Sequence, residues 1–164
     1  MRTCIFAGTF DPPTKGHLEM IKRCQKMFDK VVVAVGLNPN KTPLFSVDER
    51  LRLVRKLFEN DENVEVVSHG GLLVDLMKNY DTLFYVRGLR NEDDYKYETT
   101  MAYYNEDMYP EMITVFLPTP KEYSYVSSAA MRELIKLGAD FSQYIPEAIK
   151  EGTKKIIAEK TNKQ

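Results

Sequence analysis

The chain has 164 residues, enough for one domain with a substantial core and too few for two ordinary domains, so we expect a single domain over residues 1–164. Its formal net charge is −1, which argues against a general attraction to nucleic acid or to an acidic membrane surface. Any anionic substrate must therefore be bound by a local cluster of cations. No signal peptide opens the chain and no apolar run is long enough to span a bilayer, so we expect a cytoplasmic protein that binds neither nucleic acid nor membrane.

Apolar runs and helical patterns alternate along the chain. The predicted strands are 3–7, 30–36, 63–68, 82–87 and 112–117, and the predicted helices are 16–29, 47–59, 72–80, about 92–107, 128–137 and 146–161. Several strands are nearly continuous apolar runs, which is typical of parallel strands covered on both faces. The alternation predicts an α/β fold with a doubly wound, five-stranded parallel sheet. The lysine-rich end of the chain, from about residue 152, is expected to be a frayed helix end.

The segment between the first predicted strand and helix reads Gly8-Thr9-Phe10-Asp11-Pro12-Pro13-Thr14-Lys15-Gly16-His17. A buried strand passes here through a short turn into a helix, whose free N–H groups and positive dipole end attract anions. The segment is neither a Walker P-loop nor the G-x-G-x-x-G of a dinucleotide-binding protein. It places Thr9 at the strand end and His17 at the mouth of the helix, where His17 is the cationic candidate. We therefore predict a nucleotide-binding enzyme.

The segments that follow the other strands also carry polar and cationic residues. They are Gly36-Leu37-Asn38 followed by Lys41, Gly70-Gly71-Leu72-Leu73, Arg87-Gly88-Leu89-Arg90, and Tyr123-Ser124-Tyr125-Val126-Ser127-Ser128. Ligands of open α/β sheets bind beyond the carboxyl ends of the strands, so we expect these segments to surround one site. Gly88 lets the backbone bend so that Arg87 and Arg90 can face one anion.

Each of these candidates also has a purely structural interpretation. His17 can be an ordinary helix-start histidine, and Lys41 an ordinary loop lysine. Ser127 and Ser128 can be N-caps of the helix that follows. Capping is compatible with phosphate binding, because an exposed helix start offers donors for both.

The acidic run 91–98 can be a solvated helix face. Asp94 and Glu98 are four residues apart and share one face of a helix, so Glu98 reaches a sugar hydroxyl if that face turns toward the site. His69 is expected to be a turn residue. The sequence shows no catalytic triad, metal-ligand cluster or paired carboxylates, which favours phosphoryl chemistry without a covalent intermediate.

Two motifs resemble the signatures of the HxGH nucleotidyltransferase superfamily. They are Gly8-Thr9-Phe10-Asp11-Pro12 with Thr14-x-Gly-His17, and Val126-Ser127-Ser128-x-x-x-Arg132. Three further features resemble the phosphopantetheine adenylyltransferase family: Lys41 with Pro43-Leu44-Phe45 and Glu49-Arg50, the segment 87–90 with Asp94 and Tyr97-Glu98, and Tyr123-Ser124. The resemblance covers the chain to about residue 150 and implies a Rossmann-like nucleotidyltransferase fold.

The resemblance also implies an activity, the reversible transfer of AMP from ATP to 4′-phosphopantetheine, the penultimate step of coenzyme A synthesis. It implies Mg²⁺ as the counter-ion of ATP without a protein cage for the metal, a homohexamer, and feedback inhibition by coenzyme A. The implied catalytic residues are Thr9, His17, Lys41 and Arg90. The implied ATP-binding residues are Thr9, Phe10, His17, Gly88, Arg90, Glu98, Tyr123, Ser124, Tyr125, Val126, Ser127 and Ser128. The implied residues for 4′-phosphopantetheine are Thr9, Lys41, Leu72, Leu73, Arg87 and Asn105.

Some residues depart from the usual pattern of the family, namely Ala7, Ala129 and Tyr95-Lys96, and these departures bear on affinity. A sister nucleotidyltransferase, acting on nicotinamide mononucleotide or using CTP, is the main alternative. Thr14 argues against it, because many sister enzymes carry the first histidine of the motif there. A non-catalytic nucleotide sensor on the same fold is a second alternative. The combination of His17 with the cations of the other segments argues against a sensor.

Overall fold

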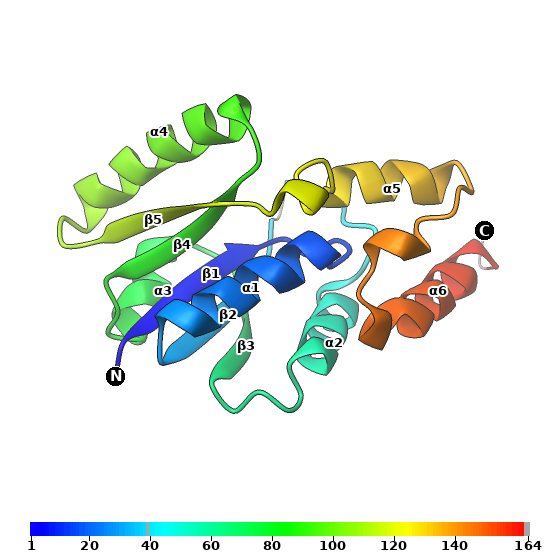
Figure 1. Cartoon of the computed structure of the whole chain (residues 1–164), viewed down its shortest axis with the longest axis horizontal. Coiled ribbons are helices and arrows are strands. Elements are labelled where there is room, and N and C mark those ends of the chain that lie inside the picture. Colours follow the sequence, from blue (N-terminus) through cyan, green and yellow to red (C-terminus); the bar gives the residue numbers. More distant parts are fainter. Residues whose placement is uncertain (39, 163–164) are drawn as a thin grey trace.

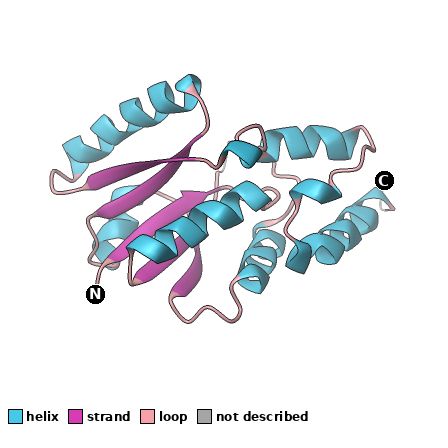
Figure 2. Cartoon of the chain, viewed as in Figure 1, coloured by secondary structure: helices cyan, strands magenta, loops and turns pink. Residues whose placement is uncertain are grey.

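Five parallel strands form one sheet, in the order β3-β2-β1-β4-β5 (Figure 1, Figure 2). The structure is a computed structural model that describes residues 1–38 and 40–162. The strands are β1 (Thr3–Gly8), β2 (Lys30–Gly36), β3 (Val64–His69), β4 (Phe84–Leu89) and β5 (Ile113–Pro118). All five predicted strands are confirmed, and each neighbouring pair is parallel.

Helices cover both faces of this sheet, which makes the fold doubly wound as predicted. They are α1 (Lys15–Met27), α2 (Val47–Leu57), α3 (Leu73–Asn79), α4 (Glu92–Met108), α5 (Ser128–Lys136) and α6 (Glu147–Thr161), with short 3-10 turns η1 (Lys121–Tyr123) and η2 (Ser142–Tyr144). Successive strand residues point to opposite faces. Cys4 and Phe6 of β1 therefore join the core under α1 and α2, while Ile5 between them joins the core under α3.

The strand order places the topological switch point beside β1. The chain runs from β1 through β2 to β3 on one side, and then returns to lay β4 and β5 on the other side. Ligands of such sheets bind beyond the carboxyl ends of the strands at this point. Figure 1 shows α5 and α6 beyond the same ends. No helix within residues 1–38 and 40–162 is long and apolar enough to cross a membrane.

The last helix, α6, packs on the body of the protein. Ile149, Thr153 and Ile156 form a buried stripe along it, and the two isoleucines share a core cluster with Phe45 and Leu53. The helix is regular to its end, which corrects the expectation of a frayed end from about residue 152. The many lysines of this segment led to the prediction of an exposed end, although every third or fourth residue is apolar or small and becomes buried. The last two residues of the expected tail lie outside the part of the chain that the structure describes.

Shortening Ile149, one of the buried side chains of α6, should therefore destabilise the whole protein. Ile149→Ala is expected to lower the free energy of unfolding by about 2–4 kcal/mol, because it removes buried methyl groups and leaves a cavity. Leu137→Ala is a matched control, since Leu137 is 72% exposed, and it should change stability by less than about 0.5 kcal/mol. Urea unfolding measures both. If Ile149→Ala were as stable as Leu137→Ala, the described packing of α6 against the core would be contradicted.

Candidate active site

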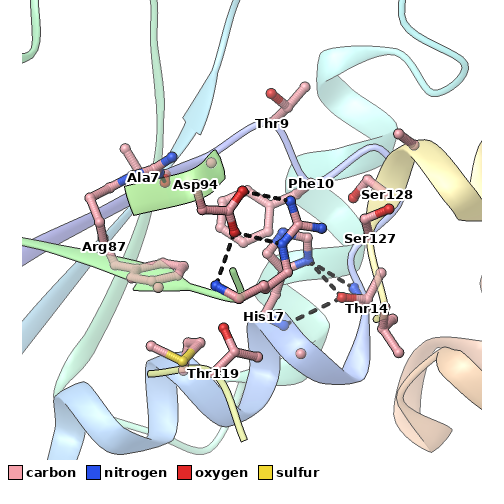
Figure 3. A pocket seen from close by; sticks show the side chains of 18 of the residues that line it. Ala7, Thr9, Phe10, Thr14, His17, Arg87, Asp94, Thr119, Ser127 and Ser128 are labelled. Atoms are coloured by element: carbon pink, nitrogen blue, oxygen red, sulfur yellow. Dashed lines mark hydrogen bonds and ion pairs between the residues drawn. The ribbon is translucent and has the colours of Figure 1, made fainter. Parts of the chain in front are cut away.

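A cavity of about 330 Å³ lies at the carboxyl ends of β1 and β4 (Figure 3). Three segments far apart in the sequence form most of its lining: the end of β1 with the turn and the start of α1 that follow it, the end of β4 with the start of α4, and the start of α5. The predicted site residues that line it are Thr9, Phe10, His17, Arg87, Gly88, Arg90, Glu98, Val126, Ser127 and Ser128. The fold thus brings the histidine and both predicted arginines to one place.

His17 is held in the cavity wall by the turn that begins α1. Thr14 is the N-cap of this helix: its Oγ1 accepts from the His17 backbone N–H at 3.4 Å, and its own N–H donates to His17 Nδ1 at 3.0 Å. A backbone N–H can only donate, so Nδ1 accepts and the neutral ring carries its hydrogen on Nε2. The ring also lies against Phe10, with the ring centroids 4.7 Å apart (Figure 3). This arrangement leaves Nε2–H as the donor available to a ligand.

The charge of His17 differs from the expectation of a cation. Burial lowers the pKa of His17 to about 4, and the positive charges of Arg87 and Arg90 contribute to the shift. The imidazole is therefore neutral at neutral pH in the free protein. The prediction that His17 supplies a positive charge is therefore wrong for the free protein. The sequence could not show this, because the burial of the ring and its closeness to both arginines arise only in the folded structure. The positive charge at this end of the cavity comes from the arginines.

This protonation state predicts a distinctive titration. In the free protein, the ring of His17 should not titrate near the ordinary histidine pKa of about 6.5. A bound polyphosphate should raise its pKa, because negative charge beside the ring favours the protonated form. Ring ¹⁵N chemical shifts followed against pH measure this, with a His69→Gln variant to assign the signals of the second histidine. A ring of His17 half-protonated near pH 6.5 without ligand would contradict the described environment.

Each of the two arginines is held by a carboxylate from α4. Arg90 pairs with Asp94 through two hydrogen bonds, of 2.9 Å from Nε and 3.1 Å from Nη2. Arg87 pairs with Glu98 and also donates to the Ala7 carbonyl. Asp94 and Glu98 therefore lie on one face of α4, and that face turns toward the cavity. The sequence alone left the direction of this face open. Hydrogen bonds from Arg90 lower the pKa of Asp94, which keeps it charged.

The start of α5 closes the opposite side of the cavity. Ser127 is the N-cap, and its Oγ accepts from the Ala130 N–H at 3.1 Å, which confirms the capping interpretation. Ser128 Oγ donates to the Pro12 carbonyl at 2.8 Å and so ties the helix to the turn after β1. Both serines still line the cavity, so capping and contact with the site coexist. The positive end of this helix dipole favours an anion there.

A smaller cavity of about 100 Å³ adjoins the first one and contains the predicted lysine. Thr9 and Arg132 line both cavities, whereas Lys41 lines only the smaller one. Thr9 therefore lies between the part of the site that contains His17 and the part that contains Lys41. An anion bound at Thr9 would therefore lie close to both His17 and Lys41.

The chain is similar over nearly its whole length to named proteins. The cytidylyltransferase-like family model matches residues 5–134. A phosphopantetheine adenylyltransferase of Clostridium botulinum (strain 657 / Type Ba4) is 42% identical over 160 residues, which cover 98% of each chain. Proteins of the same name from Campylobacter hominis and Heliobacterium modesticaldum are each 42% identical, over 91% of this chain and over 94% and 89% of theirs. This chain belongs to the phosphopantetheine adenylyltransferase family.

Some residues implied by the likeness to phosphopantetheine adenylyltransferases are not among the lining residues of either cavity. They are Leu72, Leu73, Asn105, Tyr123, Ser124 and Tyr125. Leu72 is half exposed before α3, and Asn105 is buried on α4. Tyr125 is exposed and packs edge-on against Tyr144, with the ring centroids 6.0 Å apart. The roles of these residues in binding stay predictions.

Other residues of the site received no role from the sequence. Thr14 fixes the ring of His17, and the Thr14-x-x-His17 spacing is a capping box in which histidine replaces the usual glutamate or glutamine. Met20 and Thr119 pack against Gly88, where an added Cβ would lie 3.2 Å from Met20 Cε and 3.4 Å from Thr119 Oγ1. The absence of a side chain at Gly88 thus allows close packing in the cavity wall of this chain.

Proposed function

We propose that this chain catalyses the reversible transfer of the adenylyl group of ATP to 4′-phosphopantetheine, giving dephospho-coenzyme A and pyrophosphate. Relatives that are 42% identical over as much as 98% of the chain carry the name phosphopantetheine adenylyltransferase. The structural observation that supports the proposal most is the cavity at the switch point. There, the neutral His17 lies beside two arginines and faces the start of α5, which together suit a polyphosphate.

The chemistry of this transfer requires little proton movement. The attacking group is a phosphate that is already an anion, so no strong general base is needed. A bond forms between its oxygen and the α-phosphorus of ATP, while the bond from this phosphorus to the oxygen of the departing pyrophosphate breaks. Catalysis then consists of aligning two anions and stabilising the charge that grows on the α-phosphate and on the leaving group.

The proposed roles follow from where the groups lie. His17 donates its Nε2–H to the α-phosphate, and a neutral donor suits this task because it stabilises charge without releasing a proton. Arg90 and the start of α5 bind the β- and γ-phosphates, since a guanidinium fork matches phosphate oxygens. Thr9 and Lys41 hold the attacking phosphate of 4′-phosphopantetheine beside the α-phosphate.

The remaining proposed contacts complete both substrates. Glu98 pairs with Arg87 through Oε1, which leaves Oε2 as the acceptor for a ribose hydroxyl of ATP. Further ATP contacts are proposed for Phe10, Gly88, Tyr123, Ser124, Tyr125 and Val126. Contacts with the pantetheine arm are proposed for Leu72, Leu73, Arg87 and Asn105.

Magnesium is proposed to enter with ATP. No group of three or more His, Cys, Asp or Glu side chains within the described residues is placed to hold a metal ion. The two carboxylates of the cavity, Asp94 and Glu98, are paired with arginines. This fits an ion held by the phosphates and by water, as Mg²⁺ often is in nucleotide sites. When bound, the ion would neutralise part of the triphosphate charge.

The reverse reaction tests the proposed function directly. Purified protein mixed with dephospho-coenzyme A, pyrophosphate and Mg²⁺ should form ATP, which luciferase luminescence detects. Omission of pyrophosphate is the control for contaminating ATP. Failure to form ATP with properly folded protein would refute the proposal.

A homohexamer, a cytoplasmic location and inhibition by coenzyme A are also part of this proposal. Exposed apolar side chains repeat along α4 at helical spacing, namely Tyr97, Met101, Tyr104 and Met108. Such a stripe favours an interface between copies of the chain. Tyr104→Glu should then lower the sedimentation coefficient, and an unchanged coefficient would contradict this interface.

Coenzyme A contains adenylyl and pantetheine parts and should compete with both substrates.

A further inference from the structure

Two buried charged residues, Asp11 and Arg50, lie between the turn after β1 and the segment that carries Lys41. Asp11 is 2% exposed and Arg50 is 3% exposed, and both line the smaller cavity. Burial of a charge is costly unless hydrogen bonds satisfy it. The partners of these two side chains therefore show what they hold in place.

Asp11 binds the far end of the Lys41 segment. Its Oδ1 accepts from the Phe45 N–H at 2.8 Å, and its Oδ2 accepts from the Leu44 N–H at 3.0 Å. Arg132 donates to the Asp11 carbonyl at 2.9 Å and approaches Oδ2 at 3.8 Å. The carboxylate thus fixes two consecutive backbone groups just after Lys41.

Arg50 binds three backbone carbonyls from three places. Nη1 donates to Thr9 at 2.8 Å and to Gly36 at 2.9 Å, and Nε donates to Phe45 at 3.1 Å. Thr9 follows β1, Gly36 ends β2, and Phe45 precedes α2. A single guanidinium therefore sets the positions of Thr9 and of both ends of the segment 36–45.

We propose that Asp11 and Arg50 are positioning residues that set how Lys41 meets a phosphate at Thr9. This inference rests on the proposed function. Lys41 itself is exposed, and its local turn is held by the hydrogen bond from its N–H to the Asn38 carbonyl at 3.2 Å. The long lysine side chain has many rotamers, so its effectiveness depends on where the backbone places it. A displacement of about 1 Å in such a group can lower the rate about a hundredfold.

A double-mutant cycle with Asp11→Asn and Lys41→Ala tests the proposal. Asparagine offers one acceptor oxygen in place of two, so one of the two N–H groups loses its partner. Asp11→Asn should lower kcat/KM for 4′-phosphopantetheine about a hundredfold in the wild-type background. In the Lys41→Ala background the further loss should be less than about threefold, because the group that Asp11 positions is already absent.

Two measurements separate positioning from a general structural role. The dissociation constant for ATP, measured by calorimetry, should change less than about threefold in Asp11→Asn, because His17 and Arg90 are not bound by Asp11. Asp48→Asn, an exposed carboxylate in the first turn of α2, is the control and should leave kcat/KM unchanged. Equal losses from Asp11→Asn in both backgrounds would overturn the proposal.

A second variant covers the case in which Asp11→Asn does not fold. Arg50→Lys keeps the positive charge but cannot hold three carbonyls with one ammonium in the same geometry. Because Arg50 also holds Thr9, part of its effect should persist without Lys41, but the loss should still be clearly smaller in the Lys41→Ala background. Equal losses in the two backgrounds would overturn the proposal. A folded wild-type protein inactive with 4′-phosphopantetheine would instead refute the proposed function, and this inference with it.

Discussion

The variant His17→Ala is expected to keep its fold and to lose about a hundred- to thousandfold in kcat. The reason is that His17 offers one fixed donor, Nε2–H, where negative charge grows during the transfer. The ring is held by the Thr14 cap and by Phe10, so no reorganisation is needed when that charge appears. Binding of ATP in the ground state should weaken far less, because Arg90 and the start of α5 remain. Steady-state kinetics and calorimetric ATP binding measure the two effects.

A second substitution separates the donor from the charge. His17→Gln keeps an N–H donor without positive charge, so it should retain more activity than His17→Ala. This order is expected if His17 acts as a neutral N–H donor, the state that it has in the free protein. Circular dichroism and thermal unfolding control for folding. A normal kcat in folded His17→Ala would remove His17 from the reaction.

The variant Lys41→Ala is expected to lower kcat/KM for 4′-phosphopantetheine by about a hundred- to thousandfold. Lys41 lies in the smaller cavity with Thr9, whereas Arg87 and Arg90 line only the larger one. Its loss should therefore affect the attacking phosphate, whereas the calorimetric dissociation constant for ATP should change little.

The matched control is Lys155→Ala, which removes an exposed lysine from α6 and should leave the kinetics unchanged. If Lys41→Ala weakened ATP binding and left the use of 4′-phosphopantetheine intact, the assignment of the two sides of the site would be reversed.

The strands and most helix starts could be predicted because their signals are local. The run Val31–Val35 is apolar throughout and is fully buried in β2, and Ser46 with Glu49 forms the expected capping box. The predicted strand 82–87 is displaced by two residues from β4. Thr82 looks like a strand residue, but its hydroxyl donates to the Thr3 carbonyl at 2.6 Å and it precedes the ladder.

The place of the site could be predicted because parallel strands end at a common edge. Its electrostatics could not, because they depend on distances between segments far apart in the chain. The neutral state of His17 arises from burial and from Arg87 and Arg90, which are about seventy positions away in the sequence. The packing of α6 and the bonds of the buried Asp11 and Arg50 likewise appear only when the segments are assembled.

The most direct test of the proposed reaction is pyrophosphate release from ATP and Mg²⁺ with three acceptors compared side by side: 4′-phosphopantetheine, pantetheine and nicotinamide mononucleotide. We expect release with 4′-phosphopantetheine alone. Pantetheine lacks the attacking phosphate that Thr9 and Lys41 are proposed to hold, and nicotinamide mononucleotide, which has a phosphate, is not the acceptor named for the relatives. Release with nicotinamide mononucleotide would contradict the assignment of the acceptor. Silence with all three acceptors, despite ATP binding, would contradict catalysis and favour a nucleotide sensor.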